Sequence, residues 1–269
     1  MTGWLGWGPI AACALGLLWL VYRYSFVLPA PKGLPILMYH KLSQGAEDAL
    51  TISASHFAAQ LAHLKAQGYQ SISFAELQAA LQNTRPLPSK PVLLTFDDGY
   101  LNTYELAYPL LKKYGFKATV FLPVGFIGEK NAWDEGSEPL MSFDQIRALA
   151  GTEIEFGLHS YHHENYARYS PAQMEADVSE CVKTLQKNGC GFAPVFAYPY
   201  GRMPEDVSAR KALYDIFRRH GIEFAVRIGS RINPLPPADP YEMKRTGIDG
   251  TDSPWVFQTK LRKGRVRLF

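Results

Sequence analysis

The 269-residue sequence has few cysteines, little net charge and no internal repeat or low-complexity segment. Its three cysteines do not form a disulfide framework, and we expect Cys181 and Cys190 to be free buried thiols. The net charge is only +3, and no lysine or arginine cluster is interleaved with aromatic residues, so nucleic-acid binding is not expected. Hydrophobic residues make up 47% of the chain and charged residues 20%, which excludes a disordered protein and indicates a globular one.

The first 22 residues lack any charged side chain. Their apolar stretch from Trp4 to Tyr22 would, as a helix, extend about 28 Å, close to the hydrocarbon thickness of a bilayer. We therefore expect a transmembrane anchor over residues 1–28. A cleaved signal peptide is one alternative, and a lipoprotein box at Ile10-Ala11-Ala12-Cys13 is another. Arg23 follows the segment with no basic residue before it, which favours a cytoplasmic C-terminal domain.

After a proline-containing linker at residues 29–33, apolar strand patterns alternate with amphipathic helix patterns. This alternation predicts an α/β fold with a parallel sheet, either a barrel or a doubly wound sheet. We expect one domain over residues 34–250 and a basic tail over residues 251–269. The tail is either a solvated terminus or a contact for anionic lipid or an acidic glycan. The expected strands lie near residues 35–39, 92–96, 118–122, 153–158, 194–198 and 223–226, and the main helices near 55–67, 74–81, 102–114, 143–150, 171–187 and 207–220.

Polar motifs follow four of the expected strands. Because the carboxyl ends of parallel strands meet at one end of the sheet, these motifs should converge although they are far apart in sequence. Each motif alone is also compatible with an ordinary turn or surface loop, and only their shared position favours a functional site. The motifs are His40, Asp97-Asp98, His159-Ser160-Tyr161-His162-His163 and Tyr198-Pro199-Tyr200-Gly201.

Two histidines and one carboxylate form a ligand set that suits zinc or another divalent transition ion. His159, His163 and Asp98 fit that description, with His162 as a fallback ligand. A bound cation would explain why two carboxylates stand side by side, since one can be a ligand and Asp97 a base.

The segments Thr95-Phe96-Asp97-Asp98-Gly99-Tyr100 and His159-Ser160-Tyr161-His162-His163 resemble the first two motifs of the polysaccharide deacetylases. This is the NodB-homology group of carbohydrate esterase family four. The resemblance implies a distorted (β/α)7 barrel. It also implies a divalent metal ion, Zn²⁺ before Co²⁺ or Ni²⁺. By this resemblance Asp97 is the catalytic base, and the metal ligands are Asp98, His159 and His163.

The sequence departs from the family pattern in two places. The position of the arginine that orients the catalytic aspartate holds Ala197, and no histidine follows His220 near the C-terminus. However, Ile36-Leu37-Met38-Tyr39-His40 looks like the missing histidine strand moved to the front, as in circularly permuted poly-β-1,6-N-acetylglucosamine deacetylases. His40 is then the expected general acid. The segment 245–249 is a weaker match to the family's fourth motif.

The expected activity is removal of N-acetyl groups from N-acetylglucosamine-type residues of an exopolysaccharide or cell-envelope glycan. Alternatives are deacylation or deformylation of a lipid-linked sugar and a non-catalytic glycan-binding or assembly role. Tyr161, Tyr198 and Tyr200 are candidate sugar contacts. The expected partners are the glycan, the membrane through the N-terminal helix, and exopolysaccharide synthesis or export machinery. The expected location is the cell membrane, with a single span and the catalytic domain on the periplasmic or extracytoplasmic side, although Arg23 alone favours the opposite orientation.

Overall fold

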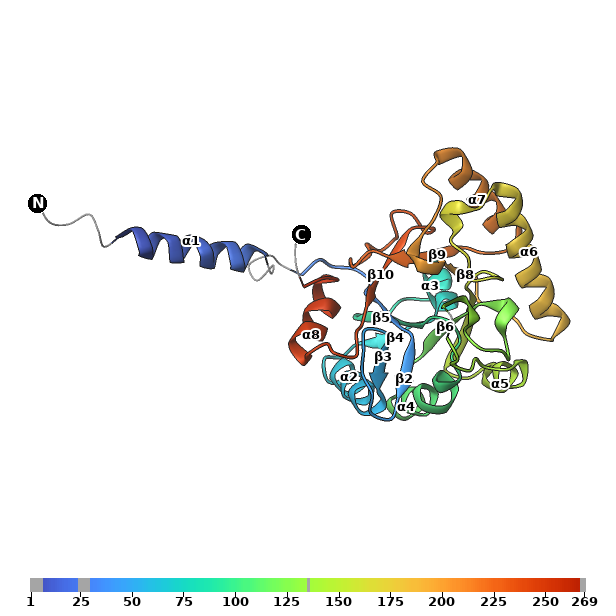
Figure 1. Ribbon diagram of the computed structural model, residues 1–269, viewed down its shortest axis with the longest axis horizontal. Coiled ribbons are helices and arrows are strands. Elements are labelled where there is room, and N and C mark those ends of the chain that lie inside the picture. The colour runs from blue at the N-terminus through green and yellow to red at the C-terminus, as the bar shows by residue number, and fades with distance from the viewer. Residues whose placement is uncertain (1–6, 24–29, 135, 267–269) are drawn as a thin grey trace, which may run out of the picture.

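A computed structural model describes residues 7–23, 30–134 and 136–266 (Figure 1). Seven parallel strands close into a barrel, because β5 pairs with β6 on one side and with β1 on the other. The predicted α/β barrel is therefore confirmed, and the doubly wound alternative is wrong. The strand order around the ring is β1 (Ile36–Tyr39), β10 (Met243–Gly247), β9 (Phe224–Ile228), β8 (Val195–Ala197), β7 (Ile154–Leu158), β6 (Ala118–Leu122) and β5 (Pro91–Phe96).

Three short strands lie outside the ring. β4 (Gln70–Ser71) pairs with the start of β5, and β2 (Lys41–Ser43) pairs with β3 (Thr51–Ser53) in a separate two-stranded sheet. Short helical segments in the connecting loops are the π-helix η1 (Thr103–Ala107) and the 3-10 turns η2 (Val124–Phe126), η3 (Ala132–Asp134), η4 (Tyr166–Arg168) and η5 (Pro199–Gly201).

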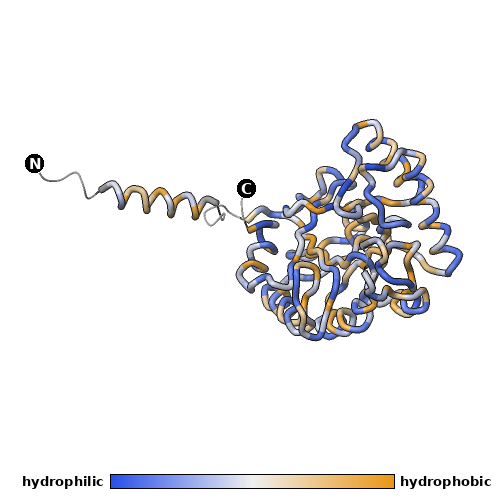
Figure 2. The backbone as a smooth tube through the Cα atoms, in the orientation of Figure 1, coloured by the Kyte–Doolittle hydropathy of each residue, from blue (hydrophilic) through white to orange (hydrophobic). Residues whose placement is uncertain are grey.

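Amphipathic helices surround the barrel and bury one face against the strands. Serine N-caps mark where several of them begin, and Ser142 and Ser170 form complete capping boxes. Figure 2 shows white to hydrophobic colouring along α1 and hydrophobic stretches in the middle of the domain, with more hydrophilic colouring at its periphery. The outer helices are α2 (Ala54–Ala66), α4 (Tyr108–Tyr114), α5 (Phe143–Leu149), α6 (Pro171–Lys187), α7 (Val207–Arg219) and α8 (Pro254–Lys263).

A short helix, α3 (Phe74–Leu81), closes the amino-terminal end of the barrel. Phe74 packs against the interior side chains Phe121 and Phe224. The half-buried carboxylate of Glu155 on β7 accepts a hydrogen bond from the Phe74 amide at 2.7 Å. The barrel interior is therefore filled at this end, which leaves the opposite, carboxyl end for chemistry.

The N-terminal helix α1 covers Trp7–Arg23 and is shorter than the predicted membrane segment. At about 1.5 Å per residue its 17 residues extend about 26 Å, less than the ~30 Å hydrocarbon core. Within the described residues, no helix combines the length and apolar character needed to cross a membrane. The predicted transmembrane helix is therefore not supported. Residues 1–6 and 24–28 of the predicted anchor lie outside the described part of the chain.

The C-terminal segment differs from the predicted solvated tail. Residues Pro254–Lys263 form α8, and its Phe257 and Leu261 are buried in the core. Apolar residues four apart face one side of a helix, so this basic segment also has an apolar side that packs on the domain. The domain thus continues beyond residue 250. Cys181 and Cys190 are free and buried, as expected.

Candidate active site

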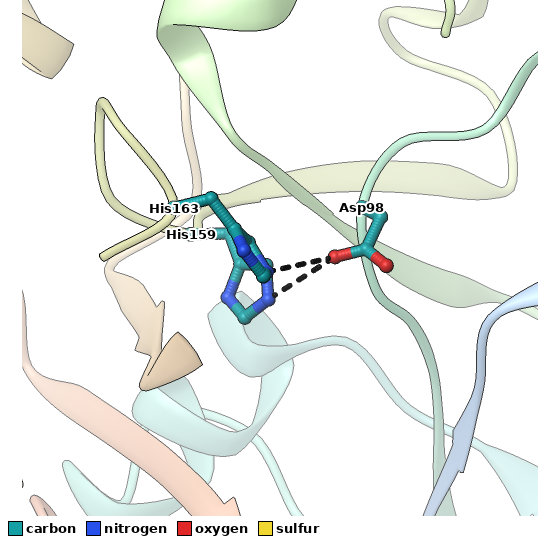
Figure 3. Close-up of side chains that lie close together, drawn as sticks. All are labelled: Asp98, His159 and His163. Carbon is teal, nitrogen blue, oxygen red and sulfur yellow. Dashed lines mark ion pairs between the residues drawn. The ribbon is translucent and has the colours of Figure 1, made fainter. Parts of the chain in front are cut away.

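The carboxyl ends of β5 and β7 bring together the predicted ligand set, as Figure 3 shows. Nε2 of His159 lies 3.4 Å from Oδ1 of Asp98, and Nε2 of His163 lies 3.2 Å from the same oxygen. The three ligand atoms lie within 4.8 Å of one another, and all three residues are buried. His162 is exposed and its ring packs on Tyr161, so the fallback ligand is not part of this cluster.

The backbone around this cluster is held in uncommon conformations. Asp98 has φ of 69°, and Ser160 and His163 have φ of 67° and 55°. Left-handed backbone is unfavourable for residues with a Cβ, so tertiary contacts must hold these turns in place. Such positions recur at active sites, where they direct side chains that regular structure would turn away.

The donor set fits a divalent cation. Nδ1 of His159 donates to the carbonyl of Ala197 at 2.8 Å, which leaves Nε2 directed at Asp98 as a metal ligand requires. Burial alone would lower the pKa of His159, but the charges of Asp97 and Asp98 raise it above its ordinary value. The site therefore attracts positive charge, which a metal ion would supply.

Asp97 is directed into a different contact from its neighbour. Arg245 of β10 donates to both of its carboxylate oxygens, at 2.5 and 2.7 Å, and also lies over the ring of Phe121. Burial alone would raise the pKa of Asp97, but Arg245 and His159 bring it below its usual range. Asp97 is therefore an ionised carboxylate next to the ligand set.

Arg245 supplies the guanidinium that the sequence lacks at Ala197. The fork of an arginine matches a carboxylate at two oxygens, and here it reaches Asp97 from β10 rather than from β8. The segment 245–249 resembled a family motif only weakly, and the sequence pattern predicted no strand there. Lys244 precedes Arg245 in β10, so no isolated basic residue in an apolar pattern identified Arg245.

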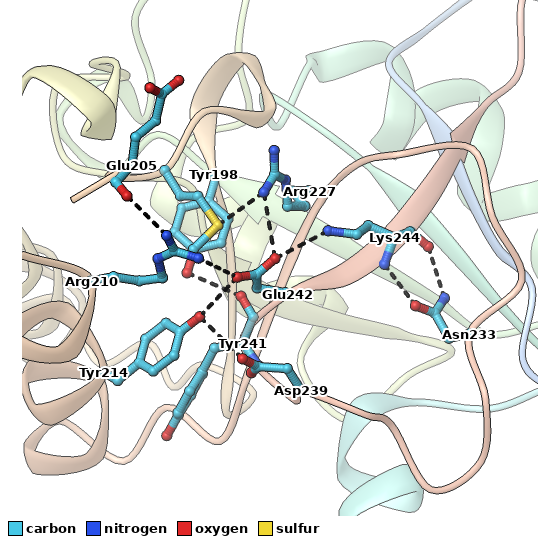
Figure 4. Close-up of polar contacts among 11 residues, drawn as sticks. Tyr198, Glu205, Arg210, Tyr214, Arg227, Asn233, Asp239, Tyr241, Glu242 and Lys244 are labelled. Atoms are coloured by element: carbon cyan, nitrogen blue, oxygen red, sulfur yellow. Dashed lines mark hydrogen bonds and ion pairs between the residues drawn. The ribbon is translucent and has the colours of Figure 1, made fainter. Parts of the chain in front are cut away.

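A polar network fixes the start of β10, beside Arg245 (Figure 4). Glu242 accepts from Arg210 of α7 at 3.0 Å and from Lys244 at 3.3 Å, and Arg227 of β9 lies 3.6 Å away. These contacts tie α7, β9 and β10 together. The strand that carries Arg245 is therefore held from outside the barrel.

His40 directly follows β1 and lies at the rim of the site. Its Nε2 is 3.9 Å from Oδ2 of Asp97, and 18% of its side chain is exposed. It is the least buried of the polar groups around Asp97, so a substrate can reach it. This position fits the predicted general acid.

Asp177 of α6 is a functional residue that the sequence analysis missed. Its buried carboxylate accepts from the Ser160 hydroxyl at 3.1 Å, the Tyr161 amide at 3.0 Å and the Tyr166 hydroxyl at 2.5 Å. A weaker contact at 3.4 Å comes from the His162 amide. One side chain thus holds the loop between the two ligand histidines. A single aspartate on an amphipathic helix gives no sequence signal for this role.

The three predicted sugar contacts occupy different environments. Tyr200 is 52% exposed and its ring centroid lies 4.9 Å from that of His163. Tyr161 is half-buried and lines a neighbouring cavity. Tyr198 is fully buried and its hydroxyl donates to the Tyr241 carbonyl at 3.1 Å, so its expected sugar contact is corrected to a packing role (Figure 4).

An aromatic cavity of about 640 Å³ opens beside the ligand set. Trp133 stacks on His163 with ring centroids 4.5 Å apart, and Tyr169 and Tyr200 form other parts of the wall. Aromatic faces next to a metal site suit a flat, partly apolar ligand such as a sugar ring. Trp133 lies in the short 3-10 turn η3, and the sequence around it has no strand or helix periodicity, which is why the sequence analysis did not select it.

Comparisons with known proteins agree with this geometry. A sequence model of the family described as polysaccharide deacetylase matches residues 84–225. YxkH of Bacillus subtilis (strain 168), whose name assigns it to the polysaccharide deacetylases, is 32% identical over 188 residues. Those residues cover 69% of this chain and 64% of that protein. A poly-β-1,6-N-acetyl-D-glucosamine N-deacetylase of Staphylococcus aureus (strain MRSA252) is 29% identical over 58% of this chain and 56% of its own. The chain thus spans less than two thirds of these relatives.

Two solved structures share the fold over most of the chain. The deacetylase PplD of Streptococcus pyogenes, in complex with acetate, has a TM-score of 0.70 and 26% identity, covering 85% of this chain and 98% of that chain. IcaB from Ammonifex degensii has a TM-score of 0.70 and 25% identity, covering 86% and 97%. Neither His40 nor Arg245 lies within the residues that the family model matches.

Proposed function

The chain belongs to the polysaccharide deacetylase family, and we propose that it hydrolyses N-acetyl groups on N-acetylglucosamine-type residues of an exopolysaccharide or cell-envelope glycan. The observation that carries this proposal is the buried set Asp98, His159 and His163 beside an ionised Asp97 held by Arg245. The poly-β-1,6-N-acetyl-D-glucosamine deacetylases among its relatives support this substrate class. A divalent ion, Zn²⁺ before Co²⁺ or Ni²⁺, is part of the proposal.

The residues divide the reaction between them. Asp98, His159 and His163 would hold the ion, which supplies Lewis acidity toward the acetamide carbonyl and the attacking water. Asp97 takes the proton of the water as it attacks, and Arg245 keeps that carboxylate ionised and oriented. His40, on the exposed side of Asp97, gives a proton to the departing nitrogen, which without that proton would have to leave as an unstable nitrogen anion. The products are acetate and a free amino sugar.

The aromatic cavity beside His163 accounts for substrate binding in this proposal. Trp133, Tyr169 and Tyr200 present ring faces on which a sugar can stack while its acetamide reaches the ligand set. We expect Trp133→Ala to raise KM for the glycan more than it lowers kcat.

Acetate release from N-acetylglucosamine oligomers of β-1,6 and β-1,4 linkage tests the function. The full chain should release acetate with zinc or cobalt, and a chelator should abolish the release. Asp97→Asn should lose activity but still bind the metal, because Asp97 is not in the ligand set. Chelator-resistant release, or an active Asp97→Asn enzyme, would contradict the mechanism.

Two substrates whose leaving groups differ in their need for a proton distinguish a proton-donor role of His40 from a general loss of activity. His40→Gln should lower acetamide hydrolysis by about 10²- to 10⁴-fold, the usual value of a general acid. It should change hydrolysis of an aryl acetate far less, because a phenolate leaves without being protonated. Equal losses on both substrates would rule out the proton-donor role.

A further inference from the structure

The amino-terminal end of the barrel, opposite the active site, carries a concentrated positive charge. Two cavities of about 790 and 650 Å³ lie there and share Tyr69 in their walls. Lys90 directly precedes β5 and Lys117 directly precedes β6, which places them at the strand starts. We call this surface the basic face, and its cations are Lys32, Lys65, Arg85, Lys90, Lys117 and Arg262.

This face is much more positive than the rest of the protein. Its two cavities are lined by six lysines and arginines and by a single carboxylate, Glu76, for a local charge of +5. The other 22 basic and 24 acidic side chains leave the remainder of the chain at −2. Glu153 and Glu223 also lie at strand starts: Glu153 precedes β7, which pairs with β6, and Glu223 precedes β9, two strands further round the ring. Neither glutamate lines the two cavities, where the positive charge is in excess.

Most of these cations have no acidic partner. Glu76 is shared by Lys117 at 2.7 Å and Arg85 at 3.4 Å. Among the described residues, Lys32, Lys90 and Arg262 form no ion pair, although Lys90 donates to the Gln67 carbonyl at 2.8 Å. Unpaired cations gathered on one face repel one another, and an anionic partner would remove that repulsion.

The chain connects this face to an apolar helix. Residues 30–33 line the smaller cavity, so the segment that carries α1 joins the domain at the basic face. Only six residues separate α1 from Ala30, a reach of at most about 25 Å at ~3.6 Å per residue. On α1, Ile10, Leu15 and Leu17 are each more than 60% exposed. An apolar helix and a cationic surface therefore occur within a short distance of each other.

We propose that the basic face binds the anionic headgroups of a membrane surface, with α1 in the same interface. Clustered lysines and arginines attract anionic lipid, and the apolar side chains of α1 add binding that a soluble acidic polymer would not use. This arrangement directs the carboxyl end of the barrel away from the lipid and toward a glycan. The inference does not depend on the proposed catalytic activity.

Vesicle co-sedimentation of the full chain tests the proposal. The protein should partition more strongly onto phosphatidylcholine vesicles that contain phosphatidylglycerol than onto pure phosphatidylcholine, and salt should weaken the difference. The triple variant Lys32→Gln, Lys90→Gln, Arg262→Gln should lose on the order of 100-fold in partitioning onto the anionic vesicles, at about fivefold per cation. Its binding to neutral vesicles should not change.

A matched triple variant controls for the loss of charge alone. Lys183→Gln, Lys187→Gln and Lys211→Gln remove three exposed lysines from α6 and α7, and anionic partitioning should stay close to that of the wild type. Wild-type partitioning without preference for anionic lipid, or equal losses in both variants, would overturn the proposal whether or not the first variant folds well. Complete competition by inorganic phosphate would indicate a small-anion site instead. Binding to an acidic polysaccharide but not to vesicles would indicate a glycan surface. Either result would also overturn the lipid assignment.

Discussion

At the scale of single residues, the two adjacent carboxylates have separate partners. Asp98 adopts a left-handed backbone, and its side chain contacts the two histidines. The side chain of Asp97 instead contacts the guanidinium of Arg245. Burial by itself would raise the pKa of both, and these separate partners lower both. Two negative charges can therefore coexist in a buried site because each has its own counter-charge.

The substitution Arg245→Lys tests whether activity requires a guanidinium that bonds both carboxylate oxygens of Asp97. Lysine keeps the charge but cannot bond both oxygens of Asp97, so the base loses its orientation. We expect kcat/KM to fall about 10- to 100-fold, the value of a charged hydrogen bond, while zinc affinity stays unchanged. Steady-state kinetics and a zinc competition assay give the two readouts. Arg227→Lys on the neighbouring strand is the control, and an equal kinetic loss there would remove the special role of Arg245.

At the scale of elements, the loop after β7 depends on helix α6. The loop backbone is left-handed at Ser160 and His163, and the carboxylate of Asp177 compensates by accepting hydrogen bonds along it. Asp177 is thus a positioning residue for the metal ligands.

Asp177→Asn should weaken zinc binding about 10- to 100-fold, as is usual when a group that orients metal ligands is changed. An amide presents a donor where the loop needs an acceptor, so the loop should shift. Competition with a chromophoric chelator measures the affinity. Glu180→Gln on the exposed side of α6 is the matched control. An Asp177→Asn protein that melts earlier but binds zinc normally would show a role in folding only.

The helix α3, which closes the amino-terminal end of the barrel, leads to a prediction about how stability depends on pH. Burial raises the pKa of Glu155, although hydrogen bonds from Thr119 and Phe74 act against the rise. A raised carboxyl pKa means that the folded protein binds the proton more tightly than the unfolded chain. The contribution of Glu155 to stability is therefore complete below the ordinary glutamate pKa and is lost as pH rises through the raised value.

Glu155→Gln should remove that pH dependence. The difference in unfolding free energy between variant and wild type should change by at most about 1.4 kcal/mol per pH unit across the window. Denaturant unfolding at a series of pH values measures it, with Glu153→Gln at the start of the same strand as the control. Parallel pH curves for Glu155→Gln and wild type would show that Glu155 does not titrate there.

At the scale of the whole molecule, closure of the strand ring brings together site residues from the N-terminal and C-terminal parts of the domain's sequence. β1 carries His40 and pairs with both β10 and β5, so His40, Arg245 and Asp97 come from three adjacent strands. Arg245 and Asp97 are 148 residues apart in the sequence, yet their side chains are in direct contact. Local unfolding of either end of the domain should therefore abolish activity.

Metal binding should stabilise the entire domain, because the ligands come from two strand ends. Zinc at about 100 times its dissociation constant adds about 2.7 kcal/mol, which corresponds to a rise in Tm of roughly 5 to 10 °C for a domain of this size. A thermal scan with zinc and with chelator measures the shift. Asp98→Ala should abolish it, whereas Asp48→Ala on an exposed loop should not. A zinc-induced shift that survives Asp98→Ala would place the metal elsewhere.

The sequence alone determined the residues proposed as ligands, base and acid: the ligand set and the base follow apolar strands, and the acid His40 was identified by the family resemblance. It also determined the alternation that predicts a parallel sheet, either a barrel or a doubly wound one. Only the tertiary structure decided which strands became neighbours, and so which arginine reached Asp97 and which tyrosine was buried. Strand order and side-chain direction depend on how the ring closes, and no local pattern encodes contacts such as those of Arg245, Asp177 and Trp133.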